Sequence, residues 1–397
     1  IKLQFSYDIN HSWGEQNKVT SDFANGGYTL ENPLFSNYFE NTRTINRVGT
    51  TFIYEVKKQR FTVGAYGRQF LASNRNIVAN TTLDQKVNAF LPYLTYRYSF
   101  ENNESIRFEY RTSAREPSVN QLQPVPDNTS PNFIRVGNPD LLPSYSNRFN
   151  LSYNVYKPIS GRYFYISANY NLDRDDFSDS TVYTNIGQTI TKTVNVQGNY
   201  YAGIYSSGNF PFFSKLLELG PSLNYNVNSN NSFINDKKNR TTTHTLGLGL
   251  SVSLNFEDIE IEIGTDYNYS KPNSTISSQD NTPYTSQVNT GELKWELPKK
   301  FRFMTSANHN TFDRRAEGFN TGFIIWNASL SKTLLKNENL ILSVDAVDLL
   351  NQNISNERQV MDNVITDTRT TIIGRYVLLK AVYKFNSNKE KEDEDEF

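Results

Sequence analysis

The segment from Thr243 to Phe256, with the sequence THTLGLGLSVSLNF, alternates almost without exception between apolar and small polar residues. Successive side chains of a β-strand point to opposite faces, so Leu248 and Leu250 share one face while Gly249 and Ser251 share the other. Soluble strands usually have about 5 to 6 residues, whereas a tilted membrane strand needs about 9 to 11. Two folds fit the pattern: a soluble sheet with leucines in a core, and an outer-membrane barrel with leucines toward lipid.

Similar patterns recur along the whole chain, whereas helical periodicity never holds for three turns. We therefore predict an all-β chain of sixteen strands. The predicted strands cover residues 1–9, 42–56, 60–72, 87–100, 104–112, 145–156, 161–172, 190–206, 215–228, 241–256, 258–270, 284–297, 299–312, 322–334, 338–349 and 371–385.

The connections between these strands alternate between short and long. The long ones are predicted at 10–41, 73–86, 113–144, 173–189, 229–240, 271–283, 313–321 and 350–370. A soluble sandwich has no reason to sort its loops in this way, whereas an outer-membrane barrel has short periplasmic turns at one rim and long extracellular loops at the other. The fold class that we predict is a transmembrane antiparallel β-barrel.

Charged residues within the strands fit the same interpretation. Arg107, Glu109 and Arg111 alternate with apolar residues, which keeps charge off the face predicted to contact lipid. Pro92 and Pro221 lie inside predicted strands, and each removes one ladder donor. We expect a local bulge or a strand end at each proline.

Composition excludes several classes of protein. The 40 Lys and Arg residues are balanced by 41 Asp and Glu, which argues against a nucleic-acid partner. There is no cysteine, so disulfides and thiolate metal sites are excluded. No run of 18 apolar residues predicts a transmembrane helix. The first residues, IKLQFSYDI, already form a strand pattern, so we interpret Ile1 as a processed end or an internal point of a longer chain.

Sites for catalysis and metal binding are not indicated. His11, His244 and His309 are far apart in sequence, and no GxSxG motif accompanies them. We interpret all three as surface or strand-end residues and predict that the protein is not an enzyme.

One acidic segment offers oxygen ligands for calcium. Asp173, Asp175, Asp176 and Asp179 lie close together, but their spacing matches no complete EF-hand loop. We therefore predict no metal site and no cofactor.

Two segments resemble a known family. The first is REPSVNQLQPVPDNTSPNFIRVGNPDLLPSYSNRF at 115–149, and the second runs from 344 to 385. They are similar to the outer-membrane beta-barrel family common in Bacteroidota, a branch of the TonB-dependent receptor superfamily. The matching residues are Gly137, Asn138, Pro139, Leu141 or Leu142, Pro143 and Ser146 in the first segment, and Asp348, Asn351 and Asn353 in the second.

The resemblance implies a receptor that binds a nutrient or metal complex with long extracellular loops, of which 113–144 and 10–41 are the largest. Family members carry a plug that blocks the lumen and is pulled by TonB, and barrels of the superfamily have twenty-two strands. This chain has fewer strands and no plug, so we expect residues 1–385 to be a portion of such a barrel and 386–397 to be an acidic periplasmic tail.

The expected partners are outer-membrane lipid and lipopolysaccharide, TonB through an upstream plug, and other envelope proteins. Two alternative functions stay open. One is a structural or scaffold barrel in an outer-membrane complex, which would lack the upstream plug. The other is an outer-membrane hydrolase, which would lose activity when His309 or His11 is replaced.

Overall fold

The computed structural model describes residues 1–32, 36–78, 80–101, 103–122, 126–130, 132–276, 281–313, 322–335, 337–361 and 364–385. Most of these residues belong to long β-strands. The long strands are β1 (Lys2–Lys18), β4 (Asn37–Val56), β5 (Gln59–Asn76), β6 (Thr81–Ser99), β7 (Glu104–Arg115), β10 (Ser144–Lys157), β11 (Arg162–Arg174), β14 (Asn199–Phe212), β15 (Leu217–Ile234), β16 (Lys237–Asn255), β17 (Ile259–Ser274), β18 (Tyr284–Leu297), β19 (Phe301–Asp313), β20 (Gly322–Leu334), β21 (Leu340–Val347) and β24 (Tyr376–Tyr383).

Shorter elements lie in the connections. They are β2 (Ser21–Ala24), β3 (Gly27–Glu31), α1 (Val119–Leu122), β8 (Asp127–Ser130), β9 (Phe133–Val136), β12 (Asp176–Tyr183), β13 (Thr189–Val196), η1 (Phe213–Lys215), η3 (Pro298–Lys300), β22 (Ile354–Met361) and β23 (Val364–Thr371). In the described part of the chain, no helix has the length and apolar character needed to cross a membrane.

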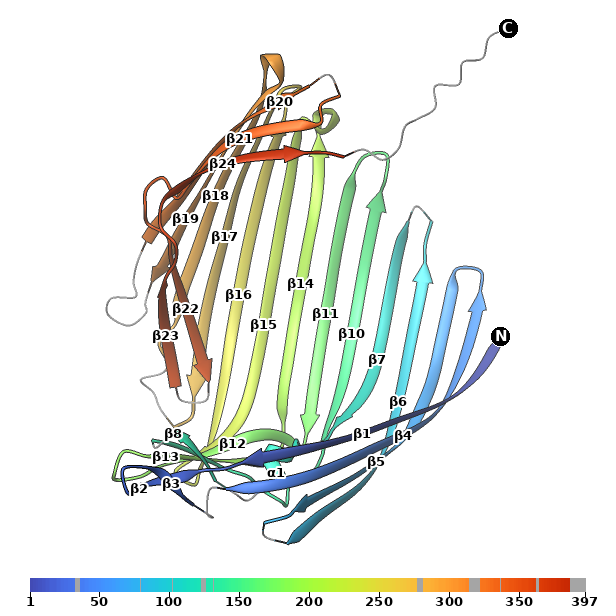
Figure 1. Ribbon diagram of the computed structural model, residues 1–397. Coiled ribbons are helices and arrows are strands. Elements are labelled where there is room, and N and C mark those ends of the chain that lie inside the picture. Colours follow the sequence, from blue (N-terminus) through green and yellow to red (C-terminus); the bar gives the residue numbers. More distant parts are fainter. Residues whose placement is uncertain are drawn as a thin grey trace.

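Each long strand pairs antiparallel with the next long strand in the chain, from β1 through to β24. The resulting sheet curves strongly around a hollow face, and β8, β9, β12 and β13 extend it to 20 strands (Figure 1). Among the described strands, β1 pairs only with β4 and β24 only with β21. The curved sheet is therefore open between these two edges.

The sixteen predicted strands correspond to the sixteen long strands, and three details of the prediction are wrong. The segment 190–206 is two elements, β13 and β14, because Gly198 between them has a φ of 80°. The connections expected at 73–86 and 229–240 are both mostly strand. β5 continues to Asn76 and β6 begins at Thr81, while β15 and β16 meet at a tight turn in which Asn235 and Asp236 have φ values of 47° and 62°. The long and short connections therefore do not alternate strictly.

The two prolines cause no bulge. Pro92 pairs with Ala65 of β5 in unbroken register, and the ladder to β7 begins at the next residue, Tyr93. Pro221 pairs with Leu250 of β16, while the ladder between β14 and β15 is interrupted beside it without a change of register. Each proline lies where one neighbouring ladder stops or is interrupted, so its missing N–H leaves the strand continuous.

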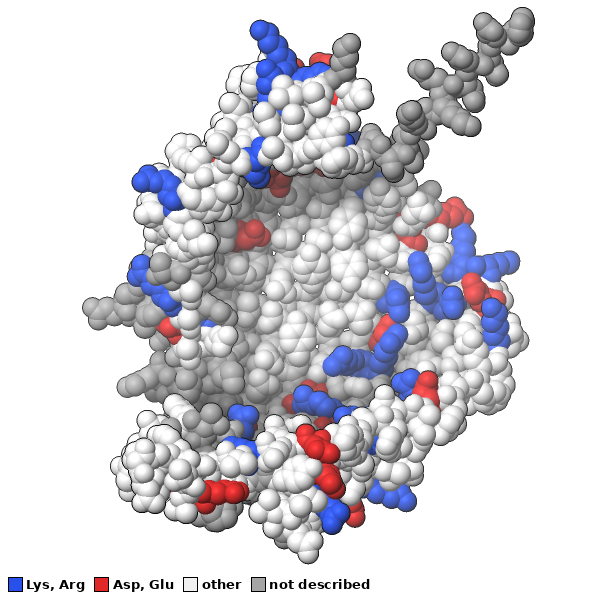
Figure 2. All heavy atoms as spheres, in the orientation of Figure 1, with Lys and Arg blue, Asp and Glu red and all other residues white. Residues whose placement is uncertain are grey.

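The two faces of the sheet differ as predicted. Leu248 and Leu250 lie on the convex face, where they are 48% and 44% exposed. Figure 2 shows Lys and Arg side chains gathered on the right side of the hollow face, over the strands that lie to the right in Figure 1. Buried apolar residues are few among the described residues, so no central core holds the sheet together. The acidic segment 386–397, predicted as a periplasmic tail, lies outside the described residues.

Candidate functional site

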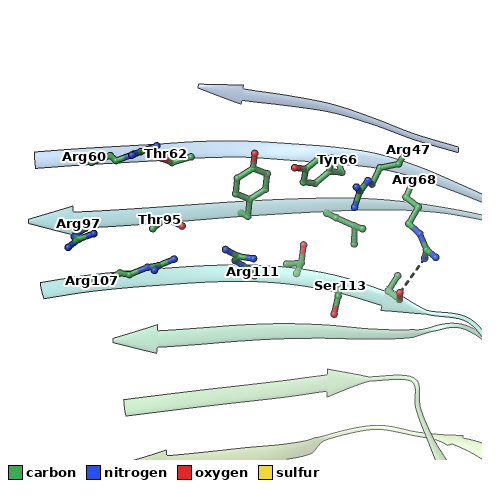
Figure 3. Close-up of a pocket in the computed structure, with 14 residues that line it drawn as sticks. Arg47, Arg60, Thr62, Tyr66, Arg68, Thr95, Arg97, Arg107, Arg111 and Ser113 are labelled. Atoms are coloured by element: carbon green, nitrogen blue, oxygen red, sulfur yellow. Dashed lines mark hydrogen bonds between the residues drawn. The ribbon is translucent and has the colours of Figure 1, made fainter. Parts of the chain in front are cut away.

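Six arginines line one hollow in the concave face, and we call them the arginine wall. They come from β4, β5, β6 and β7, and their side chains lie over these strands in Figure 3. The hollow has a volume of about 730 Å³. The arginine wall consists of Arg47, Arg60, Arg68, Arg97, Arg107 and Arg111.

Strand register brings these arginines together from distant parts of the sequence. Arg60 of β5 pairs directly with Arg97 of β6, and Arg97 pairs in turn with Arg107 of β7. Arg47 of β4 likewise pairs directly with Arg68 of β5. Side chains at directly opposed positions have Cβ atoms about 4.5 to 5.5 Å apart. Like charges are therefore held abreast over three adjacent strands.

Three carboxylates contact the arginine wall. Glu109 forms ion pairs with Arg107, at 2.6 Å, and with Arg111. Arg68 donates two hydrogen bonds to the carboxylate of Glu116, and the Arg68 Nη2 to Oε2 distance is 2.9 Å. The Glu116 side chain is 4% exposed, so this bidentate pair is shielded from water.

The third carboxylate, Asp8 of β1, accepts a hydrogen bond of 2.9 Å from Arg47 Nη2. The Arg47 guanidinium also lies 4.8 Å from the centroid of the Tyr66 ring. This arrangement is a cation–π contact, which adds to the hold on Arg47.

Two tyrosines form a flat aromatic floor in the hollow. The rings of Tyr66 and Tyr93 stack with centroids 5.3 Å apart. Each lies over a glycine on the neighbouring strand, because Gly49 pairs with Tyr66 and Gly64 pairs with Tyr93. A Cβ atom at Gly64 would lie 2.5 Å from the Tyr93 hydroxyl, so a side chain there would displace the ring. The glycines therefore let the rings lie flat beside the arginines.

The long connections form a second candidate site at the opposite ends of the strands from the short turns. β9 pairs in parallel with β13, β12 pairs antiparallel with β13, and β12 pairs in parallel with the end of β15. These pairings join the connections 116–143 and 175–198 into one structure, which we call the loop layer. It includes α1, by which it can be found in Figure 1. Leu122, Leu141 and Val196 are each less than 5% exposed and give the loop layer its own small apolar core.

Beside the loop layer lies a polar hollow of about 420 Å³, lined by residues that include Arg115, Asp176, Thr193 and Thr241. Asp176 organises it by accepting hydrogen bonds from Arg115 Nη2 at 2.9 Å, from Ser144 Oγ at 3.2 Å and from an amide side chain of β14. The hollow offers hydroxyl and amide groups rather than one dominant charge.

The acidic segment is occupied by donors from the protein itself. Asp173 accepts a hydrogen bond from Asn171, Asp175 accepts one from Gln197, and Asp179 lies 3.9 Å from Arg135. Among the described residues, no group of three or more His, Cys, Asp or Glu is arranged to hold a metal ion.

The family residues of the first segment join the two connections of the loop layer to each other and lead the chain into the barrel wall. Asn138 Nδ2 donates to Thr193 O of β13 at 3.0 Å, and its backbone N–H donates to Gln121 O of α1 at 2.6 Å. Gly137 and Leu141 are buried, whereas Leu142 is 57% exposed, so Leu141 is the leucine that fills the motif position. The remaining motif residues, Pro139, Pro143 and Ser146, lead the chain into β10.

The family residues of the second segment form a tight turn after β21. Asp348 is fully buried, has a φ of 52°, and its two carboxylate oxygens accept the backbone N–H groups of Gln352 and Asn353 at 3.0 Å each. Asn351 Oδ1 accepts the N–H of Arg375 at 2.9 Å, which ties the turn to the start of β24. Both family segments therefore have architectural roles.

The three histidines are not brought together. His11, His244 and His309 are exposed and lie on β1, β16 and β19, which are not neighbours in the sheet. His11 Nδ1 is 2.8 Å from Thr44 Oγ1, and His244 Nδ1 is 3.0 Å from the Tyr225 hydroxyl. Their interpretation as surface residues is confirmed.

Sequence reasoning missed the arginine wall as a site. It placed Arg107, Glu109 and Arg111 on the charged face of their strand, and the hollow side of β7 confirms that placement. What it lacked was the register that joins Arg60, Arg97 and Arg107. The available signal was the recurrence of an arginine on the polar face near the same end of three successive strands.

Comparisons with known proteins agree with the architecture. A model of the outer membrane protein beta-barrel family matches residues 1–286 and 219–383. No curated protein matches the chain significantly. Among solved structures, the FrpB iron transporter of Neisseria meningitidis is 10% identical, with a TM-score of 0.34, over 89% of this chain and 58% of its own.

Two other solved structures are similar at the same low level. OmpF of Salmonella typhi, in complex with daunomycin, is 10% identical with a TM-score of 0.28, over 86% of this chain and 89% of its own. The outer membrane transporter YddB of Escherichia coli is 11% identical with a TM-score of 0.26, over 97% of this chain and 74% of its own. The family model covers nearly all of the sequence, and the chain therefore belongs to the outer membrane protein beta-barrel family, as an integral β-barrel protein of the outer membrane.

Proposed function

We propose that this chain is the barrel part of a TonB-dependent receptor, of the type common in Bacteroidota, which takes up a nutrient or metal complex bound by its long extracellular loops. The observation that supports the proposal most is the loop layer, in which separate connections pair with each other and with β15 at one rim of a polar lumen. Loops held on a rigid barrel rim are well placed to bind a ligand.

The open sheet is consistent with this proposal. β1 and β24 each have one partner among the described strands, and additional strands would close the wall between them. A plug inside the completed barrel, pulled by TonB, would release the bound ligand inward. The chain spans 58% of the length of the iron transporter described above.

The test uses the producing bacterium and the intact gene. A deletion strain is grown with one nutrient or metal source limiting at a time, and is complemented with the wild-type gene in cells with and without TonB. We expect a growth defect on at least one source, restored by the wild-type gene only when TonB is present. Normal growth of the deletion strain on every source would contradict the proposal, and restoration without TonB would indicate a passive channel.

A matched pair of insertions tests the role of the loop layer. The same ten-residue tag is placed after Gly187, in the turn between β12 and β13, or after Ile159, in a short turn where the side chain is 98% exposed. We expect the first insertion to reduce uptake and the second to leave it unchanged, with both proteins folded in the membrane. Loss of an envelope complex without a growth defect would instead support the scaffold alternative.

A further inference from the structure

We infer that the arginine wall binds a small solute through an anionic group, either a carboxylate or a phosphate. The inference assigns a charge class to the transported solute and rests on the proposed function only for the direction of transport. Binding itself is measured without TonB, so failure of one idea is distinguishable from failure of the other.

Arg97 lies at the centre of the proposed site. Its direct neighbours on both adjacent strands are arginines, Arg60 on one side and Arg107 on the other. Like charges directly opposite each other destabilise a sheet. An anion placed among the three guanidinium groups would remove this repulsion, so the arrangement is more favourable with an anion bound than without one.

The protein's own carboxylates do not neutralise the centre of the wall. Glu109 is already shared between Arg107 and Arg111. Within the part of the chain that the structure describes, neither Arg60 nor Arg97 forms an ion pair. Glu55 lies opposite Arg60 on β4 in the strand register, but on the far side of β5 from Arg97. Arg97 therefore keeps its hydrogen-bonding capacity for a ligand.

The chemistry of the lining suits an oxyanion. A guanidinium group presents planar pairs of N–H donors that match the two oxygens of a carboxylate or phosphate. Thr62 and Thr95, which pair with each other across β5 and β6, add hydroxyl groups beside Arg60 and Arg97. Figure 3 shows these groups on the same side of the strands.

The size of the hollow suits a small solute. Its volume of about 730 Å³ lies within the usual range of ligand pockets, about 300 to 1,000 Å³. A neighbouring hollow of about 430 Å³ shares Arg97 and Arg107, so the solute can extend along the wall past these residues. Both hollows lie on the face opposite the apolar residues, which keeps membrane lipid phosphates away from the arginines.

The experiment compares Arg97→Gln with Arg302→Gln in the full-length protein, purified in detergent micelles. Like Arg97, Arg302 lies near a strand end next to a short turn, but it is on β19 and is paired with Glu296. Both changes remove one positive charge from the lumen near the same rim. Isothermal titration calorimetry measures binding of inorganic phosphate and of citrate, each at low and high salt.

We expect the wild-type protein to bind phosphate, citrate or both, with weaker binding at high salt. Arg97→Gln should weaken that binding at least tenfold, and Arg302→Gln should leave it within twofold. The choice between phosphate and citrate identifies the anionic group. Absence of binding of either probe to the wild type, or equal weakening by the two substitutions, would overturn the inference.

A stability measurement separates loss of a ligand contact from loss of the fold. Without added anion, Arg97→Gln should unfold at the same denaturant concentration as the wild type or a higher one, because the substitution removes repulsion. A clear decrease would show that Arg97 is a structural residue, and this result would also overturn the inference.

Discussion

Replacing Leu250 with arginine is predicted to destabilise the barrel strongly, while the same replacement at the next residue is not. On β16 the apolar residues of the convex face run from Leu246 to Leu254, and Leu250 is at their midpoint. This band of nine residues has the length of a membrane-spanning segment, about 9 to 11 residues. Arginine at the bilayer midplane of a β-barrel costs about 2 to 4 kcal/mol, and we expect that cost for Leu250→Arg.

Ser251→Arg is the matched control, because it adds the same side chain to the lumen face at the same depth. Ser251 pairs with Gly220 on β15 and with Gly264 on β17, so both direct neighbours lack a side chain. We expect a change of less than about 1 kcal/mol. Leu254→Arg, on the lipid face but nearer the short turn, should cost about 0 to 1 kcal/mol, because the penalty decreases toward the interface.

The assay is denaturant titration of the full-length protein refolded into lipid vesicles, followed by tryptophan fluorescence. Folding in cells is checked by the heat-dependent mobility of the protein on denaturing gels. We expect Leu250→Arg to be destabilised much more than either Leu254→Arg or Ser251→Arg. Equal free energies of unfolding for the 250 and 251 variants would refute the assignment of the two faces.

Three further substitutions test individual contacts. Asp348→Ala leaves the N–H groups of the buried turn unpaired and should lower the free energy of unfolding by about 2 to 4 kcal/mol in the vesicle titration. Glu116→Gln should lower the free energy of unfolding by about 3 kcal/mol in the same titration, because Arg68 loses its shielded partner. Removal of a solvent-exposed ion pair should lower the free energy of unfolding much less. At the short-turn rim, the hydrogen bond from Lys58 lowers the pKa of the Glu101 carboxyl, so this contact stabilises the fold at neutral pH and is lost as pH falls through that pKa. The difference in stability between the wild type and Glu101→Gln should therefore disappear in acid, and a difference that persists there would contradict this interpretation.

The strands and their facing could be predicted because both depend on local residues. The alternation around Leu248 identifies a strand and its two faces without knowledge of its neighbours. Element ends were less predictable, since β15 and β16 continue to the Asn235–Asp236 turn through a segment rich in polar residues. There, pairing with the neighbouring strand overrides the weak local preference of the residues.

The loop layer could not be predicted, because it depends on contacts between separate connections. β9 and β13 pair across more than fifty residues of sequence, and Asn138 joins them to α1 through hydrogen bonds that no local pattern reveals. The family resemblance marked Asn138 and Asp348 as important without giving their physical roles. The structure shows that Asn138 binds the backbone of β13, whereas Asp348 fixes its own turn by accepting backbone N–H groups.

At the arginine wall, the need to keep apolar side chains toward lipid limits the register between β5 and β6 but does not fix it completely. A slip of one residue between β5 and β6 would turn the lipid-facing side chains of one strand toward the lumen, so the membrane forbids it. A slip of two residues would keep all faces unchanged and would place Arg97 opposite Thr62, away from Arg60. The tight connection between Asn76 and Thr81 joins β5 directly to β6 and holds the register against that slip. The observed register accepts a repulsion between Arg60, Arg97 and Arg107 that an equally amphipathic register would avoid, so the requirements of the membrane alone do not explain their alignment.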